Sequence, residues 1–326
     1  MYKQKLFCLA FLCLSLAHAQ NWSLVSTPIF KPIRSMASFK GYLYATSDLN
    51  GIGCTIWSNT TANTCANLDN KYPNYSLYNY NNASLYIGRY SGMGVYKTNS
   101  AIPFNCTTTG LTLNQNTLCK TIVATPWAIL TGTYGGQAGV YKLNTGTTSW
   151  VTDNNGLTGQ QLNVNILDTM YHDVYAGTDA GVCMYHQGKW TTLDAANGNK
   201  NMRILSLKVT PTDLFVGTEK NGVYHATARS SSLNQTVWNQ LVPLTTGLPA
   251  GSVNVLFMRR DSLYAGISTS AGKPLFVAAK PSSSVWANAV WTDFSKTLPI
   301  HSVFAMIVYA GKLYAGTEYG LYMNAW

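Results

Sequence analysis

The sequence predicts an all-β fold: a seven-bladed β-propeller of four-stranded antiparallel blades. A short phrase of the type Leu-Tyr-Ala-Gly-Thr recurs seven times, with neighbouring copies 40 to 50 residues apart. Short strand-like runs bounded by turn residues fill the intervals. A repeat of this length, built from short strands, is typical of propellers, in which each unit buries its faces against its neighbours. The central residues of the copies are Tyr44, Tyr86, Leu130, Tyr175, Phe215, Tyr264 and Tyr314.

The fourth repeat shows the predicted unit most clearly. Runs at 164–170, 174–178, 182–185 and 189–193 predict an inner strand, two middle strands and an outer strand. Glycine-containing turns follow the second and third of these runs, and glycine adopts the backbone angles of tight hairpins at low cost. The outer strands carry a tryptophan whose large apolar surface suits a wedge between blades. These residues are Trp150, Trp190, Trp238 and Trp291.

The last repeat has no outer strand of its own, because the chain stops at Trp326, soon after the run 321–323. Residues 21–25 carry Trp22 where an outer-strand tryptophan would belong. We therefore expect the N-terminal strand to complete the last blade and close the ring. Closure removes exposed sheet edges, which otherwise promote aggregation.

The first residues have the pattern of a secretory signal peptide. Lys3 and Lys5 precede an apolar run at 6–16, and small residues follow at 17–19. This divides the chain into a leader, 1–19, and a propeller, 20–326. No later stretch reaches the roughly 18 apolar residues of a membrane-spanning helix. We expect an exported protein, secreted or periplasmic, that does not insert into a membrane.

The net charge of +10 does not indicate a nucleic-acid partner. Only 10% of the residues are charged, and Arg259-Arg260 is the only pair of adjacent basic residues after the leader. No basic run or basic helix is present, so nucleic-acid binding is not expected. The surface must consist largely of neutral polar and aromatic side chains. Such a surface suits a monomer that binds a glycan or a protein ligand.

Five cysteines follow the leader. In an oxidising compartment, near neighbours in the sequence are the expected partners, so we expect disulfides Cys54–Cys65 and Cys106–Cys119. Cys183 remains and lies in an apolar strand-like run, which favours a buried, unreactive thiol. No paired Cys-x-x-Cys motif or histidine cluster indicates a metal site, and no cofactor is expected.

The repeat Tyr-Ala-Gly-Thr, then Gly-Val-Tyr, then a later Trp resembles the repeats of sialidase-type and photosystem-assembly-type bacterial propellers. It is also similar to the propeller repeats of two-component sensor ectodomains. In the sialidase-type repeats, the resemblance implies an Asp box, Ser-x-Asp-x-Gly-x-Thr-Trp. The nearest match is residues 144–150, which lack the aspartate. The resemblance therefore implies an architecture for the whole mature chain rather than an activity.

One pattern predicts a ligand site. The loop after the second strand has an acid following Ser or Thr in four repeats, and an arginine or tyrosine near the same place in two others. These residues are Asp48, Asp179, Glu219 and Glu318, with Arg89 and Tyr134. Equivalent loops of a propeller lie on one face, so the side chains would surround the channel mouth, where Arg34 and Arg203 could add donors. The alternative is that each acid accepts bonds from the amides of its own turn.

We recognise no catalytic residues. The mature chain has only two glutamates, Glu219 and Glu318, and its histidines are scattered. Nucleophile elbows, His-Glu-x-x-His and phosphate loops are absent. The sequence favours a non-catalytic exported propeller that binds a glycan or protein on its loop face. The alternatives are a glycoside hydrolase or lyase with an unrecognised site, and an assembly or scaffold factor, because the fold alone does not decide function.

Overall fold

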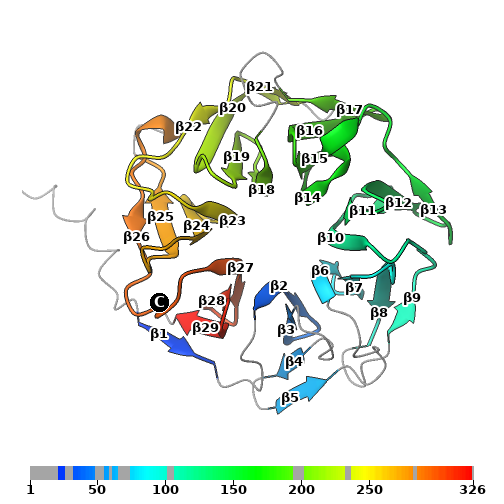
Figure 1. The fold of residues 1–326 in the computed structure, drawn as a ribbon, viewed down its shortest axis with the longest axis horizontal. Coiled ribbons are helices and arrows are strands. Elements are labelled where there is room, and N and C mark those ends of the chain that lie inside the picture. The colour runs from blue at the N-terminus through cyan, green and yellow to red at the C-terminus, as the bar shows by residue number, and fades with distance from the viewer. Residues whose placement is uncertain are drawn as a thin grey trace, which may run out of the picture.

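The structure, a computed structural model, describes residues 21–25, 32–47, 55–58, 61–64, 74–100, 106–193, 202–231, 236–281 and 285–324. The predicted leader 1–19, Asp48, and the predicted Cys54–Cys65 bond lie outside these residues. The described strands form seven antiparallel sheets arranged around a central opening (Figure 1). The prediction of an all-β propeller is confirmed.

Six of these sheets take all their strands from one consecutive stretch of the chain, with the first strand innermost. The first three contain β2 (Ile33–Phe39), β3 (Tyr42–Ser47), β4 (Thr55–Ser58) and β5 (Thr61–Thr64); β6 (Asn74–Tyr80), β7 (Ser84–Arg89), β8 (Val95–Thr98) and β9 (Thr107–Thr108); and β10 (Thr117–Ala124), β11 (Ala128–Gly135), β12 (Gly139–Asn144) and β13 (Trp150–Thr152).

The next three sheets follow the same order. They contain β14 (Val164–Met170), β15 (Asp173–Thr178), β16 (Gly181–His186) and β17 (Lys189–Thr192); β18 (Ile204–Val209), β19 (Asp213–Thr218), β20 (Val223–Ser231), β21 (Thr236–Trp238) and β22 (Val242–Pro243); and β23 (Ser252–Arg259), β24 (Ser262–Ser268), β25 (Leu275–Ala279) and β26 (Thr292–Asp293). Two short 3-10 helices, η1 (Gly159–Leu162) and η4 (Trp286–Asn288), occupy loops of the described chain. No helix among the described residues is long and apolar enough to cross a membrane.

The remaining sheet combines the two ends of the described chain. It contains β27 (Val303–Tyr309), β28 (Lys312–Thr317) and β29 (Gly320–Asn324), and β1 (Trp22–Leu24) pairs antiparallel with β29. Trp22 lies opposite Asn324 and Leu24 opposite Tyr322. The indole nitrogen of Trp22 donates to the carbonyl of Phe294, at 3.1 Å, in the loop after β26.

The outer-strand tryptophans all make the same kind of bond. Each indole donates a hydrogen bond to the sheet that precedes its own, so each side chain joins two sheets at the rim. The pairs are Trp150 with the Thr109 carbonyl (3.1 Å), Trp190 with the Asp153 carbonyl (2.7 Å), Trp238 with the Tyr175 hydroxyl (3.2 Å) and Trp291 with the Leu244 carbonyl (2.8 Å). Trp22 makes the equivalent bond for the sheet of β27 to β29.

The recurring phrase forms the second strand of each sheet and supplies the core. The central residues of its seven copies are at most 7% exposed. Clusters of buried apolar side chains lie between neighbouring sheets; one of them joins Leu130 and Leu167, and another joins Trp22 to Tyr264. Burial of this kind is the main favourable term in folding, and it depends on every sheet having two neighbours.

The glycine of the phrase permits the next sheet to approach closely. A Cβ atom at Gly177 would lie 2.6 Å from Cγ2 of both Ile166 and Ile204, and Ile204 begins the inner strand of the next sheet. A Cβ at Gly316 would lie 2.7 Å from Cγ2 of Ile33, so the same contact joins the last sheet to the first. Any side chain at these positions would push the inner strands apart.

The predicted bond between Cys106 and Cys119 is not formed, and both are free thiols. Cys106 packs against the cluster between the first and second sheets, which includes Leu85. Cys119 is buried in the cluster between the second and third sheets, with Tyr86. The two thiols therefore lie on opposite faces of the second sheet. Cys183 is a buried free thiol, and burial raises its pKa to about 11.

We predict that Gly177→Ala lowers the free energy of unfolding by about 1–3 kcal/mol, the usual cost of an added methyl group in a packed core. The cause is the contact of the new methyl with Ile166 and Ile204. Urea denaturation measures the change, and Thr191→Ala, at an exposed position of β17 in the same sheet, is the control. Equal stability of the two variants would show that the inner strands can move apart freely.

Candidate functional site

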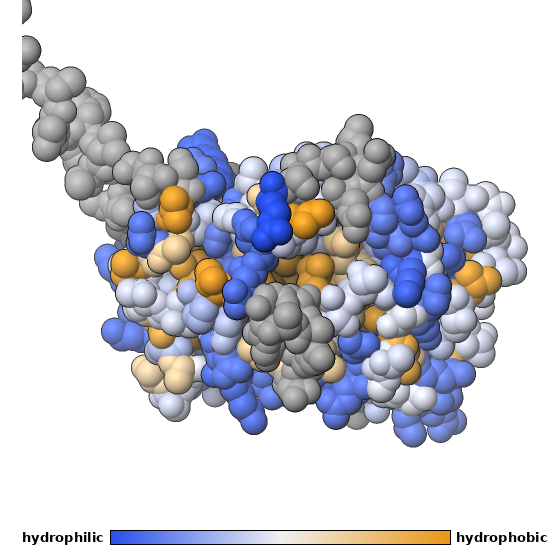
Figure 2. Space-filling model, turned by 90° about the horizontal axis from the view of Figure 1, so that it is seen from above, coloured by the Kyte–Doolittle hydropathy of each residue, from blue (hydrophilic) through white to orange (hydrophobic). Residues whose placement is uncertain are grey.

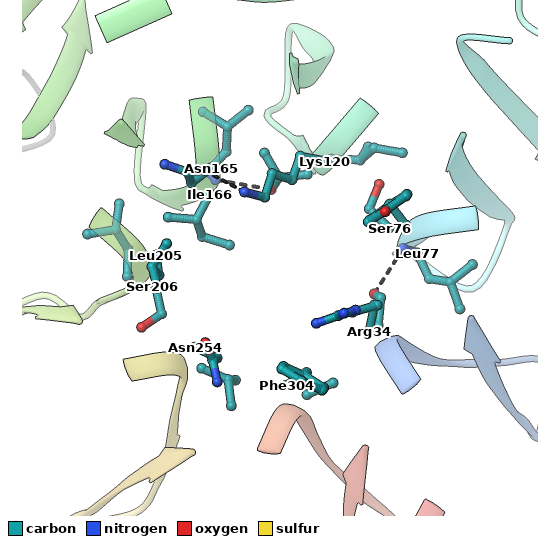
Figure 3. A pocket seen from close by; sticks show the side chains of 18 of the residues that line it. Arg34, Ser76, Leu77, Lys120, Asn165, Ile166, Leu205, Ser206, Asn254 and Phe304 are labelled. Carbon is teal, nitrogen blue, oxygen red and sulfur yellow. Dashed lines mark hydrogen bonds between the residues drawn. The ribbon is translucent and has the colours of Figure 1, made fainter. Parts of the chain in front are cut away.

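Every inner strand carries a β-bulge near its start. In each of the seven sheets described, the register between the first and second strands shifts past one residue. These residues are Arg34, Tyr75, Lys120, Asn165, Leu205, Asn254 and Phe304. All seven line a central cavity of about 640 Å³ (Figure 3). We call them the bulge ring. Bulges often redirect a side chain next to a functional site.

The residue after the bulge often tethers neighbouring inner strands. Four hydroxyl groups at this position bond to the backbone of the inner strand of the next sheet. They are Ser35 with Leu77 N (3.0 Å), Ser76 with Cys119 O (3.1 Å), Thr121 with Leu167 N (3.0 Å) and Ser206 with Val253 O (2.8 Å). These bonds fix the spacing of the inner strands, and therefore the positions from which the bulge residues project.

A polar cluster lies at one mouth of the cavity. The Arg203 guanidinium donates from Nε to Asp179 Oδ1 at 2.8 Å and from Nη1 to Glu219 Oε1 at 2.6 Å. Nη2 lies 3.4 Å from the Tyr134 hydroxyl. Tyr134 lies near the end of β11, Asp179 and Glu219 directly follow β15 and β19, and Arg203 directly precedes β18. We call these four residues the mouth cluster. It joins three consecutive sheets.

Lys120 and Asn165 connect the bulge ring to the mouth cluster. The Lys120 ammonium donates to Asn165 Oδ1, and Asn165 Nδ2 donates to Asp179 Oδ1 at 2.8 Å. Lys120 Nζ also lies 4.8 Å from the centre of the Tyr134 ring, within the range of a cation–π interaction. Asn165 is only 4% exposed, so its amide is held in one orientation by these two partners.

The surroundings disfavour the charge on Lys120. Burial, with the nearby Arg203 and Arg34 guanidiniums, lowers the pKa of Lys120 to about 8, although Asp179 and Glu219 act in the opposite direction. Burial and the Asp179 carboxylate raise the pKa of the Tyr134 hydroxyl, which therefore stays protonated at neutral pH. A lysine held partly desolvated in a cavity is a feature typical of functional sites.

The structure brings together four of the predicted site residues: Tyr134, Asp179, Arg203 and Glu219. Arg34 lies in the same cavity, on the bulge ring, and its guanidinium carbon is 4.0 Å from the centre of the Phe304 ring (Figure 3). Its place in the ring follows from the bulge in β2, which turns its side chain inward.

Two predicted residues do not join the cluster. Arg89 is 1% exposed: it ends β7 opposite Asn74, and its guanidinium carbon lies 5.1 Å from the centre of the Tyr96 ring. Its position in the paired part of the strand, rather than in the loop, buries it. Glu318 accepts a bond from the backbone amide of His301 at 2.6 Å, in the segment before β27 rather than in its own turn.

The sequence reasoning missed Lys120 and Asn165, and with them most of the bulge ring. A signal was available. In six of the seven repeats the bulge residue lies ten positions before the central residue of the recurring phrase, as Lys120 precedes Leu130. The described residues contain no group of three or more His, Cys, Asp or Glu side chains that could hold a metal ion.

Comparison with known proteins supports the fold. No protein-family model and no curated protein matches the chain. Among solved structures, the extracellular domain of BT4673 from B. thetaiotaomicron, a one-component or hybrid two-component system, superposes with a TM-score of 0.69 at 16% identity. That match covers 93% of this chain but 40% of the BT4673 chain, so this chain spans less than half of that domain.

Two further structures match over nearly their whole length. YCF48 from Cyanidioschyzon merolae gives a TM-score of 0.62 at 10% identity, over 93% of this chain and 98% of the other. The WD40 propeller domain of Doa1 gives 0.63 at 10% identity, over 93% and 96%. The resemblance to propeller repeat proteins, including sensor ectodomains, is thereby confirmed for the fold.

We predict that Lys120→Met raises the free energy of unfolding at about pH 7, by about 1–3 kcal/mol. One pKa unit corresponds to about 1.4 kcal/mol, and the half-buried position reduces the full effect of the shift from 10.5 to about 8. Between pH 8 and 10.5 the unfolded lysine holds a proton that the folded one lacks, so wild-type stability rises relative to the variant.

Urea denaturation at about pH 7 and about pH 9.5 measures this difference. Lys312→Met, at an exposed position that begins β28, is the control and should change little. A Lys120→Met protein that is less stable than wild type at neutral pH would show that the ammonium stabilises the fold.

Proposed function

We propose that the protein is a non-catalytic, exported propeller that binds a glycan in its central cavity, entering from the face of the mouth cluster. One observation carries the proposal: seven equivalent bulges aim side chains into one cavity, of about 640 Å³. Amides, cations and aromatic rings line it together, and this combination suits a ligand with hydroxyl groups and apolar ring faces. The volume falls in the usual range for small-ligand sites.

The surface favours a glycan over a protein ligand. Large hydrophobic side chains that are exposed lie singly on different elements, such as Leu24, Val151, Tyr171 and Val290. On the side seen in Figure 2, hydrophobic residues form small patches among hydrophilic ones. Protein interfaces are centred on a contiguous desolvated patch. The concave cavity is therefore the better candidate for recognition.

The mouth cluster favours binding over hydrolysis. Glycosidases need one carboxyl group as a proton donor and a second as a base or nucleophile. Asp179 and Glu219 both accept hydrogen bonds from Arg203, so both carboxyl groups are already occupied as acceptors. We therefore place the glycoside hydrolase or lyase alternative second, and the scaffold alternative third.

The proposal also covers the processing, oligomeric state and ring closure of the protein. Residues 1–19 are removed on export, and residues 20–326 act as a monomeric, single seven-bladed ring that the N-terminal strand closes. The pairing of β1 with β29 and the Trp22 bond to Phe294 support this closure. The extracellular placement of the BT4673 domain supports export, as an analogy between folds.

We predict that a glycan array probed with the mature protein gives a defined set of binders, and that Arg203→Ala weakens this binding at least tenfold. Loss of the guanidinium leaves Asp179 and Glu219 with unbalanced charges at the mouth, which should disorder the cluster. Titration calorimetry with a bound glycan measures the change.

Arg260→Gln is the matched control, because this arginine is exposed in the turn between β23 and β24 at the opposite face. Binding that survives Arg203→Ala but falls with Arg260→Gln would contradict the proposal, because it would place the ligand at the face opposite the mouth cluster. An empty array together with a specific protein in a pull-down would replace the glycan with a protein ligand.

A second prediction tests closure. Trp22→Ala should lower the free energy of unfolding by about 3–5 kcal/mol, since it removes a buried indole and its bond to Phe294.

Deleting residues 20–27 should leave the edge of β29 unpaired and cause aggregation, measured by light scattering. A monomeric deletion variant of wild-type stability would mean that the ring does not need β1.

A further inference from the structure

Lys120 is a cation that lines the cavity, and no carboxylate of the described residues forms an ion pair with it. Its ammonium contacts the Asn165 amide oxygen and the Tyr134 ring, and no ion pair is found for it among the described residues. The two acids whose charges act on Lys120 already form ion pairs with another residue. Asp179 and Glu219 pair with Arg203, at 2.8 and 2.6 Å.

Asp168 lines the cavity itself, and it is also engaged. Asp168 pairs with Lys208 at 3.1 Å and accepts the Val209 amide at 2.9 Å. Rearrangement of the described acids to neutralise Lys120 would therefore break an existing ion pair. A direct anionic partner for Lys120 would therefore come from outside these residues.

A second cation projects into the same space. Figure 3 shows Arg34 on β2 and Lys120 on β10 both directed into the cavity, with Phe304 beside Arg34. Asn254 and the hydroxyl-bearing strand residue Ser206 line the side opposite Lys120 and Ser76 in this view. An anionic group held near Lys120 would leave the rest of a sugar ring among amides, hydroxyls and an aromatic ring.

We propose that the ligand is an acidic sugar, and that Lys120 binds its anionic group, a carboxylate or a sulfate, inside the bulge ring while Arg34 adds a second positive charge. This inference rests on the proposed function, because it names the ligand class of the same cavity. The protonated ammonium is the binding form, so an anion and a proton bind together.

Binding should therefore depend on pH through Lys120. The titratable and charged groups that face it come from several elements: Arg34 on β2, Tyr75 and Tyr78 on β6, Tyr134 on β11, Asp168 on β14, Asp179 after β15, Arg203 before β18 and Glu219 after β19. Burial raises the pKa of Tyr78 and of Tyr134 above 10, so neither ionises where Lys120 does. Between pH 7 and 9, Lys120 is the group expected to titrate, around its pKa of about 8.

The test uses three probes that share one ring: D-glucose, D-glucuronate and D-glucose 6-sulfate. Titration calorimetry on the mature protein at about pH 6.5 should show at least one acid binding at least tenfold more tightly than glucose. Its affinity should fall about tenfold per pH unit above the Lys120 pKa. The difference between the two acids distinguishes carboxylate from sulfate.

Two variants distinguish the effect of the positive charge at position 120 from the effect of its loss as the pH rises. Lys120→Met should remove the preference for the acid, whereas Lys120→Arg should keep it and abolish the pH dependence, because arginine stays charged throughout this range. The NMR signal of the dimethylated Lys120 amine should report a pKa that rises when the acid is added. Lys312→Met is the control and should leave both readouts unchanged.

The outcomes keep this inference separate from the proposed function. Glucose binding as tightly as both acids, or an acid preference that survives Lys120→Met, overturns the acidic ligand but leaves a glycan-binding cavity. Acids that neither bind nor raise the Lys120 pKa overturn it as well, even if a neutral glycan on the array binds in an Arg203-dependent way. Failure of every glycan, neutral or acidic, overturns both.

Discussion

The inner strands converge on a common axis without belonging to one sheet, and the rest of the structure depends on how that space is filled. Their backbones cannot pair across sheets, so small residues and hydroxyl groups set their separation. The recurring glycine, as at Gly177, allows the next sheet to approach, and Ser76 or Ser206 then bonds to its backbone. The bulge is the one place where an inner strand departs from regular pairing. It directs one side chain per sheet into the cavity, and the hydrogen-bonded pairing of the strand continues on both sides of it.

The same arrangement explains why the cavity can carry a function at little cost to the fold. Bulge residues lie outside the hydrophobic clusters between sheets, so their chemistry can vary around the ring. Some of them bond to the neighbouring inner strand, as Lys120 does to Asn165 and Asn254 does to the Val303 carbonyl. Leu205 and Phe304 occupy the same structural position as Arg34, Lys120 and Asn254. Ion pairs between sheets occur in the mouth cluster and also in the pairs Asp168–Lys208 and Asp213–Lys280, and partly exposed ion pairs contribute little to stability. The polar residues of the bulge ring are therefore the ones on which the proposed recognition depends.

The sequence predicts the propeller well because the residues that build it recur. Each copy of the phrase places an apolar side chain such as Tyr175 or Leu263 between sheets, and the outer-strand tryptophans mark the rim. The mouth cluster could be predicted in part, since acids at one loop position of a repeat must share a face. Arg89 could not be excluded, because one position along a strand separates a loop side chain from a buried one. The Cys106–Cys119 pairing failed because nearness in sequence does not reveal that a sheet lies between two thiols.

Lys120 was missed for a different reason. In a strand, alternate side chains point to opposite faces, and a lysine between Cys119 and Thr121 reads as a solvent-facing residue. A bulge breaks that alternation, and in a propeller the direction it opens is the central cavity. There the ammonium loses hydration, which lowers its pKa to about 8, while the acids nearest to it are committed to Arg203. A fold under selection for stability alone would replace such a lysine with an apolar residue, since burial of a charge that has no direct ion-pair partner is costly. The proposed anionic ligand would give this ammonium the direct partner that the described acids do not provide.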